Sequence, residues 1–274
     1  MKQKLPIFIL VFLNFQLAIA QVNLASWNIQ HLGKSKSEDN IAYMAEVLRD
    51  FDIIAIQEVV AGPGGAQAVA RLVDELNRKG SKWDYKISDP TKSSPYSSER
   101  YAYIWKTHKV KIQDQAFLDQ NFVDEIEREP YVIRFSYKDE TFTLFNFHAV
   151  PTKKQPEREV KYFRNYPDLY PDETLIFMGD FNLVDHHTVF NPLKNKGYEL
   201  AFEGQKTSLK MKCDTQKEND CLSKVYDHFI FPSKKLNVLK KGVIHFYKDF
   251  EDIKSARKIS DHIPIWMEFE IETE

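Results

Sequence analysis

Residues 175–182 have the sequence Leu175–Ile176–Phe177–Met178–Gly179–Asp180–Phe181–Asn182, and the rest of the chain is interpreted outward from them. Four consecutive apolar residues predict a buried strand that is covered on both faces. Asp180 and Asn182 follow two positions apart, so an extended chain places both side chains on one side and turns Phe181 into the core. Their oxygens are suited to a divalent cation and a phosphate group. An ordinary Asp/Asn-rich turn is the alternative.

The composition is that of a folded α/β protein. The chain has 274 residues, of which 43% are hydrophobic and 28% charged, so it can build a large core and is not disordered throughout. We find no internal repeat and no linker rich in Pro or Ser, and therefore expect residues 21–274 to form a single domain. The formal net charge is −2, which argues against tight nucleic-acid binding driven by counterion release.

Residues 1–20 have the pattern of a signal peptide. Lys2 and Lys4 precede an apolar run from Leu5 to Leu13, and Ala18–Ile19–Ala20 offers small residues at a cleavage site. The run is too short for a membrane span, so no stable membrane association is expected. We expect an exported protein, periplasmic or secreted, and the loss of two lysines takes its formal charge from −2 to −4.

The two cysteines lie close together in a polar stretch. In an oxidising compartment Cys213 and Cys221 are expected to pair. Closing so short a loop should contribute roughly 2–3 kcal/mol in the chain-entropy model. A metal site is the alternative, but further soft ligands are lacking nearby. We therefore expect a disulfide that fastens a loop and has no chemical role.

Strands and helices alternate in the first 80 residues. The expected elements are a strand over 22–27 leading to Asn28, a helix from a cap at Ser37 or Asp39 to about Arg49, a strand over 51–56 ending in Gln57–Glu58, a loop over 62–65 and a helix over 66–78. This rhythm predicts parallel strands that carry polar residues at their carboxyl ends.

After residue 82 the pattern changes to short alternating runs, which suggest antiparallel strands. The expected strands cover 83–88, 101–106, 110–113, 131–137, 141–148, 225–231, 237–239 and 263–271, with a hairpin turn at 138–140 and a third helix from Pro156 to about Tyr166.

Several of these strands end in Asn, Asp, Glu or His. The residues are Asn28, Glu58, His148, Asp180 with Asn182, Asp227, and Asp261 with His262. One polar residue at a strand end is ordinary, but six such ends without a catalytic Ser or Cys motif favour phosphate and metal chemistry. Because parallel strands place their carboxyl ends on one edge, we expect these side chains to meet there.

Six blocks of sequence together resemble the endonuclease/exonuclease/phosphatase superfamily. The blocks are Trp27–Gln30, Ile56–Val59, Asn146–His148, Gly179–Asn182, Val225–Asp227 and Ile259–Pro264. The resemblance implies a four-layer α/β sandwich, with two packed mixed β-sheets flanked by helices. It also implies phosphoester hydrolysis that depends on a divalent metal, Mg²⁺ or Mn²⁺, and it leaves a structural Ca²⁺ ion open.

Within the superfamily the chain is similar to pancreatic-type deoxyribonucleases. Glu99–Trp105 is similar to the Glu-Arg-Tyr strand of that branch, and Arg128–Val132 to its Arg-Glu-Pro segment, in which the Arg meets phosphate. The branch also has a disulfide shortly before its Tyr-Asp motif, where Cys221 lies. Two positions depart from it: Val60 replaces a DNA-contacting Arg, and Tyr96 is shifted by one residue from the groove-contacting Tyr.

The resemblance assigns roles to individual residues. It pairs His148 with Glu99 and His262 with Asp227, and two such pairs can divide the acid and base work of phosphodiester hydrolysis. We expect His262 to activate water and His148 to protonate the leaving group. Metal ligands are expected at Glu58, Asp180 and Asp261, and a phosphate contact at Arg128. Asn28 and Asn182 are expected to bind the scissile phosphate or the ion.

Some neighbouring residues have simpler interpretations. Asp227 and His228 are adjacent on a strand and must face opposite sides, so we expect Asp227 in the site and His228 in the core. Asp261 has an alternative role as a cap of the loop before Pro264. His186 and His187 are expected on a solvated loop.

The expected function is an exported, metal-dependent endonuclease that cuts DNA with little sequence preference, because phosphate contacts position a substrate without specifying its bases. DNA is the expected partner, and we expect a monomer. Another phosphoesterase on the same scaffold, a phosphatase or a sphingomyelinase-like lipid phosphodiesterase, is the alternative. The candidate membrane-dipping segment for the lipid enzyme is the short run 243–247. A secreted binding protein that keeps the fold without activity is the third alternative.

Overall fold

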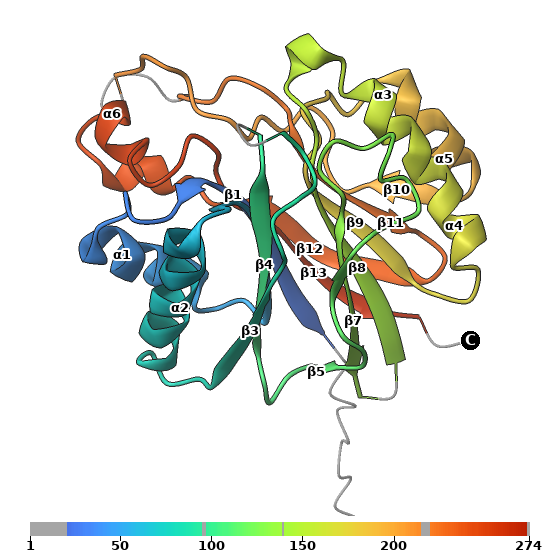
Figure 1. Cartoon of the computed structure of the whole chain (residues 1–274), viewed down its shortest axis with the longest axis horizontal. Coiled ribbons are helices and arrows are strands. Elements are labelled where there is room, and N and C mark those ends of the chain that lie inside the picture. Colours follow the sequence, from blue (N-terminus) through green and yellow to red (C-terminus); the bar gives the residue numbers. More distant parts are fainter. Residues whose placement is uncertain (1–20, 95–96, 139, 215–219, 273–274) are drawn as a thin grey trace, which may run out of the picture.

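Two β-sheets lie face to face in the computed structural model, which describes residues 21–94, 97–138, 140–214 and 220–272 (Figure 1). The expected signal peptide at 1–20, Tyr96 and the middle of the expected hairpin turn at 138–140 lie outside the described residues. Among the described residues, no helix is long and apolar enough to cross a membrane.

The first sheet has six strands in the order β12-β13-β1-β2-β4-β3. Their bounds are β1 (Val22–Leu32), β2 (Ile53–Val60), β3 (Trp83–Ile87), β4 (Glu99–Lys106), β12 (Leu236–Val243) and β13 (Ile265–Ile271). β1 and β2 are parallel, as the strand–helix–strand rhythm predicts, and the other neighbours are antiparallel. β4 separates β2 from β3.

Two amphipathic helices cover the outer face of this sheet (Figure 1). α1 (Glu38–Leu48) begins at the predicted cap, since the Ser37 hydroxyl accepts from the Asn40 amide at 3.2 Å. α2 (Pro63–Asn77) begins three residues earlier than predicted, so the loop expected over 62–65 is wrong. Pro63 suits the first helical turn, and a Cβ on Gly65 would lie 2.0 Å from the Val60 carbonyl oxygen. Glycine therefore lets the helix start close against β2.

The second sheet has the order β10-β11-β9-β8-β7-β5, with β6 also paired to β7. Its strands are β5 (Lys111–Ile112), β6 (Phe117–Leu118), β7 (Tyr131–Tyr137), β8 (Glu140–His148), β9 (Leu175–Asp180), β10 (Tyr198–Leu200) and β11 (Asp227–Pro232). β8 and β9 are parallel and the other pairs antiparallel, so this sheet is mixed as well.

Short helices cover the outer face of the second sheet (Figure 1). The helix expected from Pro156 to Tyr166 is divided into α3 (Glu157–Val160), the 3₁₀ helix η2 (Lys161–Asn165) and α4 (Tyr166–Leu169). Pro167 in the first turn of α4 has no N–H to donate, which is consistent with this break. The remaining helical elements are η1 (Thr152–Lys154), η3 (Thr188–Phe190), α5 (Asn191–Asn195), η4 (Phe246–Asp249) and α6 (Ile253–Ala256).

Three apolar cores separate the layers. One lies between α1, α2 and the first sheet, one between the two sheets, and one between the second sheet and α3–α5. Phe177 and Phe181 face the third core, and Ile176 and Met178 face the second, so β9 is covered on both sides as its apolar run predicts. The predicted four-layer α/β sandwich is confirmed.

β1 and β2 continue beyond the strand ends that the sequence predicts. Asn28 and Glu58 therefore lie inside strands, each next to an irregularity in the pairing. The register shifts between Asn28 and Leu32 on β1, and between Ile56 and Val59 on β2. A bulge redirects a side chain without ending the strand, which hydrophobic alternation alone does not reveal.

Gly179 gives a test of how closely β9 approaches β8. Its φ is +129°, and a Cβ there would lie 1.9 Å from the Phe147 carbonyl oxygen. We predict that Gly179→Ala lowers the free energy of unfolding by roughly 2–5 kcal/mol, because backbone strain and steric overlap act together. Urea denaturation measures this loss.

Gly80→Ala is the matched control. Gly80 also has a positive φ, +96°, but beyond its two chain neighbours no atom of the described residues lies within 4 Å of the added methyl group. Strain alone should cost about 1 kcal/mol there. Equal losses at both positions would contradict the steric explanation for Gly179.

Candidate active site

Three neighbouring strands of the second sheet place His148, Asp180 and Asp227 side by side. His148 is in register with Asp180 across β8 and β9, and Asp180 with Asp227 across β9 and β11. All three side chains are buried. The ends of these strands thus gather one imidazole and two carboxylates at a single edge of the sheet.

The first imidazole pairs with a carboxylate from the other sheet. His148 Nδ1 lies 2.9 Å from Glu99 Oε2, and Arg128 Nη1 donates to the same oxygen at 3.0 Å. Burial favours the neutral form of Glu99, but His148 and Arg128 outweigh it and hold the pKa of Glu99 below its usual value. Burial and Arg128 oppose protonation of His148, whereas Glu99 and Asp180 prevail and raise the pKa of His148.

The second imidazole pairs with a carboxylate of β11. His262 Nδ1 lies 2.7 Å from Asp227 Oδ2, and the backbone oxygen of His262 accepts from the Trp27 indole at 2.7 Å. Burial opposes the charged imidazolium, but Asp227 and Asp180 outweigh burial and raise the pKa of His262 well above its usual value. The ring is thereby fixed through Nδ1 and leaves Nε2 free to face the site.

Both Nε2 atoms approach the same oxygen. Asp180 Oδ2 lies 3.5 Å from His148 Nε2 and 3.6 Å from His262 Nε2. Asn28 Nδ2 donates to this oxygen at 3.2 Å and to Glu58 Oε1 at 3.1 Å. Burial raises the pKa of Asp180. Asp180 therefore lies next to both histidines and to Asn28 of β1, and Asn28 links it to Glu58 of β2.

The surrounding backbone is strained where it borders the site. Glu58, Asn182 and His31 have φ values of +60°, +51° and +52°, in the left-handed region that side chains other than glycine rarely adopt. All three line a cavity of about 560 Å³ together with the two imidazoles. Such strain collects at functional sites, where the surrounding structure maintains it to aim particular groups.

The side chains fit a divalent cation. Glu58 and Asp180 both accept from the side-chain Nδ2 of Asn28, and the Oδ1 of that amide is buried with no hydrogen-bond partner among the described residues. Rotation of the amide would direct Oδ1 toward the two carboxylates, giving the oxygen ligands that Mg²⁺ and Mn²⁺ prefer. Asp180, Asp227 and His262 also offer ligand atoms within 4.8 Å of one another.

Arg128, Asn182 and Asp261 border the same cavity, and each already makes hydrogen bonds with its neighbours. Arg128 donates to Glu99 and to the Ala149 carbonyl oxygen, while its Nε is buried and has no partner in the described part of the chain. Asn182 Nδ2 donates to the Ala149 carbonyl oxygen at 3.1 Å. Asp261 Oδ2 accepts from Gln30 at 2.8 Å and from Arg257 at 3.2 Å. The phosphate and metal roles of these three residues stay predictions.

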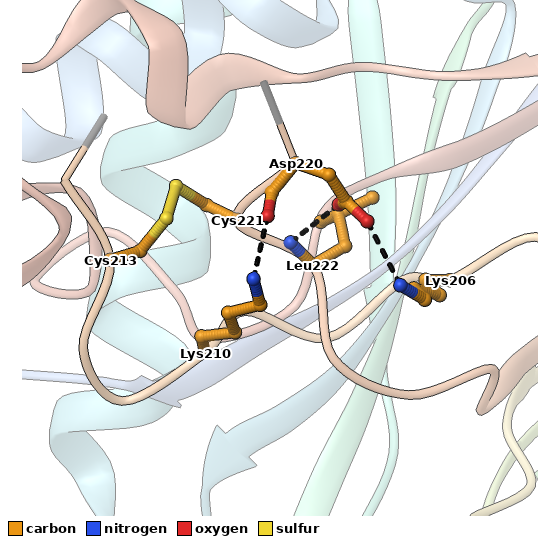
Figure 2. The surroundings of a disulfide bond; sticks show 6 residues. All are labelled: Lys206, Lys210, Cys213, Asp220, Cys221 and Leu222. Atoms are coloured by element: carbon orange, nitrogen blue, oxygen red, sulfur yellow. Dashed lines mark hydrogen bonds and ion pairs between the residues drawn. A yellow bond between two sulfur atoms is a disulfide. The ribbon is translucent and has the colours of Figure 1, made fainter. Parts of the chain in front are cut away.

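The expected disulfide between Cys213 and Cys221 is present (Figure 2). Asp220 accepts from Lys206 through its carboxylate at 2.9 Å and from Lys210 through its carbonyl oxygen at 2.8 Å. Thr207 carries no sequence signal in this polar segment, yet its hydroxyl donates to Asp227 Oδ2 at 2.5 Å.

Comparison with known proteins shows the family. Residues 25–262 match the endonuclease/exonuclease/phosphatase family, and the chain belongs to that family. Over 276 residues it is 30% identical to a deoxyribonuclease of Thioalkalivibrio sp. (strain K90mix), covering 92% of this chain and 72% of that relative. Over 191 residues it is 30% identical to deoxyribonuclease-1 of Mus musculus, covering 64% of each chain.

A solved structure shows the same fold. The family protein from Bacteroides thetaiotaomicron matches with a TM-score of 0.65 at 18% identity, covering 93% of this chain and 99% of that chain. At this identity the likeness concerns the fold alone.

His228 predicts a dependence of stability on pH. It packs against Phe181 and Phe190, as expected for the residue that faces away from the site, and its Nε2 donates to the Leu183 carbonyl oxygen at 2.7 Å. Burial lowers the pKa of His228 below its usual 6.5. The unfolded chain therefore takes up this proton more readily, and the free energy of unfolding should fall as pH drops below about 6.5.

His228→Gln keeps a donor near Leu183 but cannot titrate. Relative to this variant, the wild type should lose at most about 1.4 kcal/mol per pH unit between pH 7 and 5. Denaturant unfolding at a series of pH values measures the difference. Parallel stability profiles for the two proteins would show that His228 is not held neutral in the folded state.

Metal binding gives a second prediction. A cation that binds the folded chain alone raises its stability, by about 2.7 kcal/mol at one hundred times the dissociation constant. We predict that Mn²⁺ raises the melting temperature of the wild type and that Glu58→Gln removes most of this increase. Glu46→Gln on the exposed side of α1 is the control. An unchanged Mn²⁺ effect in Glu58→Gln would exclude Glu58 as a ligand.

Proposed function

We propose that this chain is a divalent-metal-dependent phosphodiesterase that hydrolyses DNA with little sequence preference. One observation carries the proposal: two imidazoles, each tied through Nδ1 to its own carboxylate, direct their Nε2 atoms to the same oxygen of Asp180. This arrangement suits a reaction that needs one proton removed and one proton delivered at a single phosphate. The relatives named deoxyribonucleases support DNA as the substrate.

The two pairs are proposed to divide the proton transfers. A water oxygen bonds to phosphorus while its proton passes to Nε2 of His262, which accepts it in the neutral form of the ring. The bond from phosphorus to the 3′-oxygen breaks, and that oxygen takes a proton from His148 Nε2. Glu99 and Asp227 hold the rings in the required tautomers and stabilise the imidazolium form of each.

The remaining residues are proposed to hold the phosphate and the cation. Glu58, Asp180 and Asn28 would bind Mg²⁺ or Mn²⁺, and Asp261 is a further proposed ligand at the cavity border. The bound cation would polarise the phosphate oxygens and offset the charge of the carboxylates. Asn182 and Arg128 are proposed to contact the phosphate, and the unpartnered Nε of Arg128 is a donor suited to that contact.

Low sequence preference, export and a single domain are part of the proposal. The cavity offers groups that bind phosphate and cations, which carry no information about bases. The signal-peptide pattern of residues 1–20 and the disulfide support export to the periplasm or the medium. Residues 21–274 are proposed to act as one domain, because both sheets contribute to one site. A monomer is also proposed.

The test is nicking of supercoiled plasmid DNA by the purified protein with Mg²⁺. We predict nicking that a chelator abolishes. His148→Ala and His262→Ala should each lower the rate by roughly 10²–10⁴, because each removes a general acid or base. Agarose-gel time courses give the rates.

His186→Ala is the matched control, because the side chain of His186 is 82% exposed and lies outside the cavity. It should cut at the wild-type rate. A choline phospholipid is assayed in parallel. Lipid turnover without nicking would favour the lipid phosphodiesterase alternative, and inertness on both substrates would leave a binding protein.

A further inference from the structure

We propose that Thr207 is a positioning residue for the His262–Asp227 pair; this inference rests on the function proposed above for the same site. Thr207 is fully buried. Its hydroxyl donates to Asp227 Oδ2 at 2.5 Å, and the same oxygen accepts from His262 Nδ1 at 2.7 Å. One carboxylate oxygen is thus held between the hydroxyl and the imidazole.

The direction of the hydroxyl proton follows from its other contacts. Thr207 Oγ1 accepts from the backbone N–H of Tyr226 at 3.2 Å and from that of Asp227 at 3.1 Å. A hydroxyl has one proton and two lone pairs, so both lone pairs are occupied and the proton is directed to Asp227. The arrangement uses the full hydrogen-bonding capacity of the side chain.

The backbone of Thr207 also hydrogen-bonds to the segment that carries Asp227 and to the segment that carries His262. Thr207 N donates to the Lys224 carbonyl oxygen at 2.7 Å, shortly before Asp227. The Thr207 carbonyl oxygen accepts from Ile263 N at 2.8 Å, directly after His262. The same residue therefore contacts the segments that carry the carboxylate and the imidazole.

The disulfide-bonded Cys221 is connected to Thr207 by backbone contacts between residues 207–210 and 221–224. Next to the disulfide, Lys210 N donates to the Cys221 carbonyl oxygen at 2.8 Å. Leu209 pairs with Leu222, and Ser223 N donates to the Ser208 carbonyl oxygen at 2.7 Å. These contacts hold the segment from which the Thr207 hydroxyl reaches Asp227.

The other His–carboxylate pair has a comparable third member. Arg128 donates to Glu99 Oε2 while that carboxylate holds His148. Each carboxylate is therefore restrained by a donor besides its imidazole, a guanidinium at one pair and a hydroxyl at the other. Thr207 does not line the cavity, so removal of its hydroxyl should change the turnover of bound substrate more than its binding.

The test compares kcat and KM for nicking in three variants. Thr207→Val removes the hydroxyl and keeps the branched shape, whereas Thr207→Ser keeps the hydroxyl. Thr143→Val is the matched control. Thr143 is buried near the start of β8, away from His148 at its end, and its hydroxyl donates to the carboxylate of Glu173. Melting temperatures are measured for all three.

We expect Thr207→Val to lower kcat about 10- to 100-fold, the loss of one hydrogen bond to a charged group, with KM unchanged. Thr207→Ser should restore most of kcat, and Thr143→Val should keep the wild-type value. If Thr207→Val does not fold, Thr207→Ala replaces it in the same comparison. A wild-type kcat in the folded Val or Ala variant would overturn the proposal, as would an equal loss in Thr207→Ser.

The nicking activity of the wild type distinguishes failure of the positioning role from failure of the proposed function. Absence of nicking by the wild type would overturn the proposed function. Nicking by the wild type that Thr207→Val leaves unchanged would overturn the positioning role alone.

Discussion

The buried carboxylate of Asp180 is the group on which the arrangement of the site depends. It lies between two imidazoles and the amide of Asn28, and it is 1% exposed. A charge so far from water needs compensation from its surroundings, because burial alone favours the neutral acid. Both sheets supply partners for it, so the contact between the sheets is also what assembles the site.

The strained backbone around the site also serves to place groups next to Asp180. Glu58 and Asn182 occupy the left-handed region, which costs stability unless neighbouring contacts impose it. In return Glu58 shares the side-chain amide of Asn28 with Asp180, and the backbone N–H of Asn182 donates to Asp180 Oδ1 at 2.9 Å. The proposed cation would balance the carboxylates, which accounts for a site that places several acidic groups together.

Much of the fold could be predicted from the sequence because buried strands have strong apolar patterns. The run before Gly179 is covered on both faces, and Ser37 caps α1. The expected loop over 62–65 was wrong because the helical start depends on close packing of Gly65 against Val60, a contact distant from any local signal. The bulges at Asn28 and Glu58 likewise depend on neighbouring strands.

The candidate site was predictable in its principal residues and less so in their partners. Strand ends and the family resemblance identify His148, Asp180 and His262, and the structure brings these three together; their catalytic roles are proposals. Thr207 lies in an irregular polar segment, where a threonine is ordinary and its contact with Asp227 depends on how that segment folds.

The central claim is that one cation and one phosphate meet at Asp180. The most direct measurement is anomalous X-ray scattering from crystals grown with Mn²⁺. This account predicts a manganese peak coordinated by the carboxylates of Glu58 and Asp180. A manganese peak at another acidic cluster, together with no peak between Glu58 and Asp180, would contradict this prediction.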